Sequence, residues 1–293
     1  MGYSGRYHAA SLAAVFIALA IGILIGVGLA DDVVSSASQE LEDSLRSDLE
    51  GAETRAGELD SQLARERDFG QRIYPALVAG RLAGSSVAVV GFGELSGQPV
   101  DEIEAALEPA GASVDAVAVV AVPPDPAALA EAAPPQFASA RRGGEGLTRL
   151  GESAGAGLVG GSNLLTDLRG TLFSRFSGTL ENVDRIVFTG APESDLDPDQ
   201  QDDTDALATG IYDGAKSAAA AVVAVERTDT EPTTLAPFTD AGIATVDHAD
   251  LVAGRVALVF SLLGAGGDYG VKPGADSFLP ELINPADRPA ATP

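Results

Sequence analysis

Residue types that carry much of metal and redox chemistry are scarce or missing in this chain. It has no cysteine, which excludes disulfides, zinc–thiolate sites, iron–sulfur clusters and thiol catalysis. The redox compartment therefore cannot be judged from cysteine usage. The single methionine is Met1, and the only histidines are His8 and His248. Metal chemistry on this chain is thus restricted to carboxylates and two imidazoles.

Positive charge is also scarce. The 18 basic side chains face 43 acidic ones, and the formal net charge is −25. A polyanion of this kind repels nucleic acid and anionic lipid headgroups, so neither is expected as a partner. The 293 residues are enough for one large or two small domains with proper cores.

One long apolar run is present near the N-terminus. Residues 9–30 contain no charged side chain, and as a helix they would span about 33 Å, enough for a hydrocarbon core of about 30 Å. The apolar region of a signal peptide is usually about 7–15 residues long. Length therefore favours an uncleaved transmembrane anchor, although Gly28 and Ala30 are small enough for a signal peptidase site.

The charges that flank this run predict its orientation. Arg6 precedes it, whereas Asp31 and Asp32 follow it, and the nearest later cation is Arg46. Positive charge favours the cytoplasmic side. We therefore expect a single-pass protein of the cell membrane, with residues 1–8 in the cytoplasm and everything after residue 30 outside.

Small residues recur every four positions along the apolar run. Such a ridge lets two helices approach closely in lipid, so it predicts self-association; the alternative is that alanine and glycine are simply abundant here. The ridge consists of Ala10, Ala14, Ala18, Gly22, Gly26 and Ala30.

Residues 31–69 read as a helical stalk. Apolar residues spaced alternately four and three apart are typical of a coiled coil, and charged residues occupy the positions between them. The pattern predicts a short parallel coiled coil, hence a homo-oligomer; the alternative is an amphipathic helix that lies on its own domain. The core positions are Leu45, Leu49, Ala52, Ala56, Leu59 and Leu63.

From residue 70 to 271 apolar strands alternate with helices. The expected strands are residues 86–90, 114–122, 185–188, 221–225 and 243–246. The expected helices are residues 100–109, 145–151, 163–176, 203–217 and 251–263. Continuous apolar strands separated by helices predict an α/β domain with a mostly parallel sheet flanked by helices. Residues 123–144 and 191–204 are expected as long loops, and 272–293 as an extended tail.

Two motifs of this domain resemble ligand sites only in part. Gly91-Phe92-Gly93 follows the first strand, as in dinucleotide-binding folds, but Ser96 stands where that fingerprint needs a third glycine or alanine. A tight turn is favoured. The acidic stretch 193–199 alternates carboxylates, but Gln200 and Ala206 replace the glycine and glutamate of a calcium loop. A solvated acidic loop is favoured.

His248 is the main candidate for metal binding. With Asp247 or Asp250 it could hold copper(II) weakly, and alternation along a strand would favour the pair with Asp250. Ser162 lacks the Gly-x-Ser-x-Gly setting of a hydrolase nucleophile. No catalytic residue and no cofactor site is therefore predicted, and we expect a protein that is not an enzyme.

Three segments together resemble a known family. They are the start of the apolar run (residues 7–22), the stalk with the first strand–helix–strand unit up to Val120, and a C-terminal stretch. That stretch contains Ala244–Asp247, Asp250, Gly254–Val256, Gly266–Gly270 and Pro273–Ala275. The chain resembles the copper transport outer-membrane proteins (MctB-like) of actinobacteria over nearly its whole length.

This resemblance implies a role in copper efflux or homeostasis in the cell envelope, with copper the only metal implied. It transfers no catalytic motif. Copper(I) prefers cysteine and methionine sulfur, which residues 31–293 lack. The alternative function is a structural or scaffolding envelope protein that self-associates and binds protein partners.

Overall fold

The computed structural model describes residues 5–95, 97–190 and 196–281 and divides into two units, Met1–Glu66 and Arg67–Pro293. One helix, α1 (Gly5–Val78), makes up the described part of the first unit, and its last turns belong to the second. The apolar segment Tyr7–Val27 lies in the first unit, and none of it is buried. The predicted apolar helix is therefore confirmed.

The helix continues beyond the predicted end of the stalk at residue 69. It passes through Gly70 and Pro75 and ends at Val78. Tyr74 and Val78 are buried in the core of the second unit, and Gly70 lies against the side chain of Val252. Tertiary packing therefore keeps these turns helical despite a glycine and a proline, which disfavour helix.

The second unit is built on one seven-stranded sheet with the order β3-β2-β1-β4-β5-β6-β7. All neighbouring strands are parallel except β3, which pairs antiparallel with β2. The strands are β1 (Ser86–Phe92), β2 (Ser113–Val120), β3 (Phe173–Gly178), β4 (Arg185–Thr189), β5 (Ala221–Val225), β6 (Ala244–Val246) and β7 (Asp268–Tyr269). The predicted mostly parallel α/β fold is confirmed.

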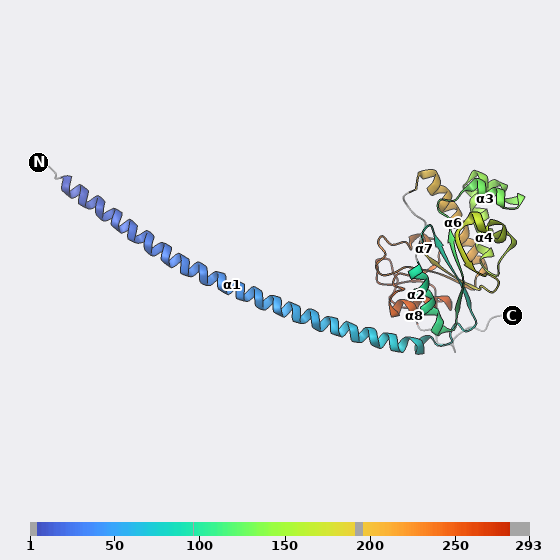
Figure 1. The fold of residues 1–293 in the computed structure, drawn as a ribbon, viewed down its shortest axis with the longest axis horizontal. Coiled ribbons are helices and arrows are strands. Elements are labelled where there is room, and N and C mark those ends of the chain that lie inside the picture. Colours follow the sequence, from blue (N-terminus) through green and yellow to red (C-terminus); the bar gives the residue numbers. More distant parts are fainter. Residues whose placement is uncertain (1–4, 96, 191–195, 282–293) are drawn as a thin grey trace. The chain divides into compact units, whose positions relative to one another are not determined.

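Helices cover both faces of this sheet (Figure 1). One face packs against the end of α1, α2 (Gly97–Leu107) and α8 (Val252–Leu262). The other packs against α3 (Pro126–Ala132), α4 (Glu145–Gly157), α5 (Asn163–Leu172), α6 (Pro198–Ala218) and α7 (Ala236–Asp240). Short 3-10 helices are η1 (Glu108–Ala110) and η2 (Pro135–Arg142). Because both faces are covered, the inner strands are mostly apolar, as in buried parallel sheets.

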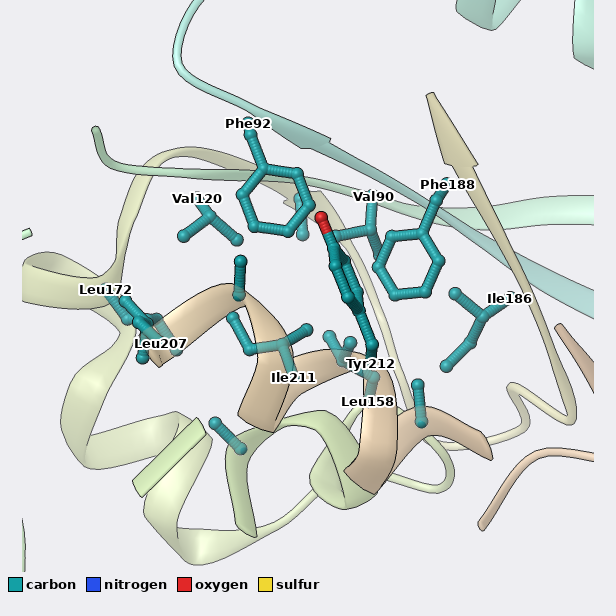
Figure 2. Packing of buried hydrophobic residues seen from close by; sticks show 14 of the residues in the cluster. Val90, Phe92, Val120, Leu158, Leu172, Ile186, Phe188, Leu207, Ile211 and Tyr212 are labelled. Carbon is teal, nitrogen blue, oxygen red and sulfur yellow. The ribbon is translucent and has the colours of Figure 1, made fainter. Parts of the chain in front are cut away.

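An aromatic cluster fills the larger of the two cores. Tyr212 of α6 lies edge-on to Phe92 and Phe188 from the carboxyl ends of β1 and β4, and its ring centroid is 4.8 Å from that of Phe238. Figure 2 shows the rings of Phe92, Phe188 and Tyr212 together with the aliphatic side chains around them. The cluster joins α6 and α7 to the centre of the sheet.

Three predicted segments differ from the structure. The loop expected at 191–204 contains the start of α6, which begins at Pro198 and not at residue 203. The helix expected at 163–176 ends at Leu172, and Phe173–Gly178 forms the edge strand β3. The loop expected at 123–144 contains α3, which begins because the Asp125 side chain accepts hydrogen bonds from the N–H groups of Ala127 and Ala128. Capping by aspartate followed by proline at the first helical position is a strong start signal, and it was present in the sequence.

The tail expected from Lys272 is irregular, but its described part is not detached. Tyr269 and Ser277 form a parallel bridge, and Gly270 N donates to Ser277 O at 2.9 Å. Pro280 is buried. Residues 282–293 lie outside the described residues.

Candidate functional site

The candidate metal residues Asp247, His248 and Asp250 follow the carboxyl end of β6, next to the carboxyl end of β5. Val225 of β5 and Val246 of β6 are in register, so the residues that follow them, Glu226 and Asp247, emerge at the same edge of the sheet. Glu226 N donates to Val246 O at 2.9 Å. In parallel α/β sheets this edge is where ligands bind.

The Asp247 carboxylate is hydrogen-bonded to the chain's own backbone. Its carboxylate accepts hydrogen bonds from the N–H groups of Val271 (2.9 Å) and Lys272 (2.7 Å). A Cβ on Gly270 would lie 2.0 Å from this carboxylate, so the close approach requires glycine at position 270. Residues 270–272 therefore form a backbone cradle around one anionic group.

His248 is completely buried. Its Nδ1 lies 3.2 Å from Asp247 Oδ1, and its ring stacks on Phe278 with 5.2 Å between ring centroids. Because Asp247 can only accept when ionised, Nδ1 carries the proton and Nε2 the lone pair. Nε2 has no hydrogen-bond partner among the described residues. Burial lowers the pKa of His248, against the opposing charge and hydrogen bond of Asp247 and the charge of Asp250.

The Asp250 carboxylate is hydrogen-bonded to Thr228 and not to His248. Its Oδ1 accepts from both the backbone N–H (2.7 Å) and the hydroxyl (2.9 Å) of Thr228. Strand alternation would have paired Asp250 with His248, but β6 ends at Val246, so the condition for that pairing is not met. His248 contacts Asp247 instead.

These residues do not fit a copper ion. Both Asp247 oxygens and Oδ1 of Asp250 already accept hydrogen bonds from the chain's own donors, and one free imidazole nitrogen is a single ligand. Across residues 5–95, 97–190 and 196–281, no group of three or more histidine, aspartate or glutamate side chains is arranged to hold a metal ion.

A buried charged residue of this edge that sequence reasoning missed is Glu226. Its side chain is 2% exposed and pairs with Lys272, whose Nζ lies 2.7 Å from Glu226 Oε1. The hydroxyls of Thr233 and Thr234 and the N–H of Thr234 also donate to it. A glutamate directly after an apolar strand was a signal for this position.

The other motifs have structural roles. A Cβ on Gly91 would lie 2.9 Å from the Leu95 side chain, so the chain itself fills the space beside this turn; Ser96 lies outside the described residues. Ser162 caps α5 by accepting from Leu165 N at 3.2 Å. Within the acidic stretch, Asp197 caps α6 by accepting from Gln200 N, and residues 193–195 lie outside the described residues.

The candidate association residues are surface residues of α1 in the first unit. Leu45, Leu49, Leu59 and Leu63 are each more than half exposed. Ala14 and Ala18 are exposed too, and a Cβ added at Gly22 or Gly26 would have no neighbour within 4 Å. The whole set therefore stays available on one helix.

An apolar helix near the N-terminus followed by a helix-flanked parallel sheet defines a membrane-anchored α/β protein. The chain belongs to the family of copper transport outer membrane proteins, MctB, which it matches over residues 3–280. No curated protein matches it. This membership makes it a copper transport-related protein of the cell envelope.

Proposed function

We propose that this protein serves copper efflux or homeostasis as a non-enzymatic, single-pass membrane protein that acts through assembly or a protein partner, without capturing the ion itself. This proposal rests on one observation: the carboxylates of Asp247 and Asp250 already accept hydrogen bonds from the chain's own backbone, beside a buried His248. Family membership supplies the link to copper.

Ligand chemistry supports the same proposal. Copper(I) is a soft ion that selects thiolate and thioether sulfur. After residue 30 the chain has neither cysteine nor methionine and a single histidine. A carrier of copper(I) would need ligands that this part of the chain does not contain, so a partner has to provide them.

The proposal is tested by equilibrium copper binding to the full-length chain in detergent. Copper(I) and copper(II) are titrated against a competing chelator, on the unmodified protein and on His248→Ala. We expect no stoichiometric copper after dialysis in either case. Tight copper(I) binding that persists in His248→Ala would contradict the ligand argument and the partner-based role together.

A second candidate function is a self-associating scaffold of the envelope that binds other proteins. The exposed leucines of α1 favour it, because an apolar row on an isolated helix is stabilised when a second helix covers it. Deletion of the gene separates the two candidates. Copper sensitivity supports the copper role, whereas normal copper tolerance with an altered envelope supports the scaffold.

A further inference from the structure

The C-terminal strap, defined here as residues 270–281, crosses the carboxyl edge of the sheet beyond β6 and β7. Beneath it lies a hollow of about 220 Å³. The strap contributes Lys272–Ala275 to its wall, and the body of the domain contributes Thr239 of α7, Thr245 of β6 and Asp268 of β7. A segment that spans a hollow is less tightly packed than one that lies on a filled core.

Polar contacts hold the strap more than apolar ones do. Its large apolar side chains, Val271, Phe278 and Leu279, are between 37% and 52% exposed. Little hydrophobic stabilisation therefore attaches them. The attachment rests on two carboxylates of the domain body, Glu226 and Asp247, and on backbone hydrogen bonds to β7, where Asp276 N donates to Asp268 O at 2.7 Å.

The Lys272 ammonium group is fully satisfied in this arrangement. Nζ donates to Glu226 Oε1 (2.7 Å) and to the main-chain oxygens of Arg227 (3.1 Å) and Thr230 (2.6 Å). An ammonium has three protons, so it has none left for a ligand. The Glu226 side chain is almost completely buried, and a charge buried at that depth needs its partner.

The far end of the strap covers His248. Phe278 stacks on the imidazole ring, and the ring has no exposed surface. Between the two ends, Gly274 has φ +108° and no neighbour within 4 Å of a Cβ. Gly270, at the base, is the point where the strap leaves β7. The backbone at Gly274 can therefore rotate with little steric resistance, whereas Gly270 gains that freedom once it moves off the Asp247 carboxylate.

We propose that the strap is a lid that opens as one unit about Gly270, with the Glu226–Lys272 ion pair as its latch. Opening uncovers the hollow beside Thr239 and Thr245 and, at the same time, the imidazole of His248. Lys272 is held at one end of the strap, and His248 is covered by the other end. Because the strap moves as one unit, the two side chains should become accessible together. This inference does not depend on the copper role.

The sequence offers an internal reference for testing the lid. Lys216 and Lys272 are the only lysines, and His8 and His248 are the only histidines. Lys216 is exposed, whereas Lys272 is half-buried and His248 buried; His8 lies in the apolar segment Tyr7–Val27, which detergent covers, so free N-acetylhistidine in the same solution is the open reference for His248. Pulse labelling of the full-length protein in detergent with an amine-reactive ester and with diethyl pyrocarbonate, read by mass spectrometry, therefore compares each covered side chain with an open reference.

In the unmodified protein we expect Lys272 to react at least about tenfold more slowly than Lys216, and His248 at least about tenfold more slowly than free N-acetylhistidine, because reaction needs local opening. Glu226→Gln removes the latch and should accelerate both covered residues by a similar factor. The matched control is Glu231→Gln, an exposed carboxylate of the same loop, which should change neither rate.

Two results would overturn the lid. One is a Lys272 that already reacts as fast as Lys216 in the unmodified protein. The other is a Glu226→Gln variant in which Lys272 is labelled faster but the labelling rate of His248 is unchanged. The Glu226–Lys272 ion pair would then hold only the lysine and not the whole strap. Hydrogen exchange of α8 amides shows whether Glu226→Gln is folded. If it is not, Lys272→Met, read through His248 alone, must show the same acceleration.

Discussion

Gly151 of α4 lies directly against the backbone of α6, so closely that a Cβ at this position would come within 2.4 Å of the carbonyl oxygen of Leu207. The contact is reciprocal, because a Cβ on Gly210 of α6 would lie 2.1 Å from the carbonyl oxygen of Thr148 in α4. Gly155 and Gly214 repeat the arrangement one turn further on. The two helices therefore touch through their main chains.

Gly151→Ala should destabilise the globular unit. The added methyl meets backbone atoms that cannot rotate away, and overpacking of this kind costs about 1–3 kcal/mol, occasionally more. Urea denaturation of the full-length chain measures the loss. Gly170→Ala in α5 is the matched control: no atom lies within 4 Å of its Cβ, so alanine should stabilise by about 0.5–1 kcal/mol. Equal behaviour of the two variants would contradict the contact.

The same four-residue spacing of small residues occurs in two settings. In the apolar segment Tyr7–Val27 it predicts helix association in lipid, and nothing in the described residues covers that ridge. In α4 and α6 it brings two helices of one domain together. The spacing predicts that a helix can be approached closely; which partner approaches it depends on the rest of the fold.

Two buried tyrosines differ in the hydrogen bonding of their hydroxyl groups, so replacing each by phenylalanine should have opposite effects on stability. The Tyr74 hydroxyl donates to the carbonyl oxygen of Ala106, whereas the Tyr212 hydroxyl has no partner among the described residues. In Figure 2 the Tyr212 hydroxyl lies among the side chains of Val90, Phe92 and Phe188. Burial raises the pKa of both phenols, so both are neutral in the folded protein.

Tyr74→Phe should lower the free energy of unfolding by about 1 kcal/mol, because it leaves a buried carbonyl without its donor. Tyr212→Phe should leave it unchanged or raise it, because it removes a buried polar group that lacks a partner. Denaturation of both variants side by side checks this. A loss in Tyr212→Phe as large as that in Tyr74→Phe would indicate a hidden partner for the hydroxyl.

The central strands could be predicted from sequence because both faces of the sheet are buried and most of their residues are therefore apolar. Strand β3 was missed because Phe173 and Phe176 fit a helical spacing with Leu165, Leu168 and Leu172. An edge strand with polar residues is recognisable only from its pairing with β2. At the candidate site, His248 and Asp247 were found by residue type. The latch between Glu226 and Lys272 joins residues far apart in the chain, and no local pattern predicts it.

The stability of the globular unit should fall as the pH drops below the ordinary pKa of histidine. Burial lowers the pKa of His248 from its usual value of 6.5, so the unfolded chain binds a proton at a higher pH than the folded one. The stability from neutral His248 is present above pH 6.5 and is lost as the pH falls toward the lower folded-state pKa. Thermal unfolding of His248→Gln should show a smaller fall between neutral pH and about pH 5. Parallel curves would assign the acid sensitivity to carboxylates.

Topology is checked with a reporter fused after Pro293. Arg6 before the apolar segment and Asp31 and Asp32 after the predicted anchor favour a cytoplasmic N-terminus. A reporter that is active only in the cytoplasm should therefore be silent in this fusion, and the same reporter placed before Met1 should be active. Activity of the C-terminal fusion would reverse the proposed orientation.

Self-association should depend on both parts of α1. Replacing Gly22 and Gly26 by isoleucine should weaken close contact within the membrane, and Leu45→Asp with Leu59→Asp should remove the contribution of the stalk, because charge at core positions of a coiled coil is strongly unfavourable. Cross-linking in membranes measures both effects.

Matched controls for this experiment lie on other faces of the same helix. Ala20 is on the side of the apolar segment away from Gly22 and Gly26, and Thr54 is on the outer side of the stalk, so Ala20→Ile and Thr54→Asp should leave the cross-linked dimer unchanged. The anchor places all copies in the same direction in one membrane, which aligns identical heptads in a parallel pair without a further cost in orientation. Leucines exposed on a single helix would then be covered in the pair. If the unmodified protein yields only monomer under these conditions, the exposed leucines serve another partner, and the self-association hypothesis is wrong.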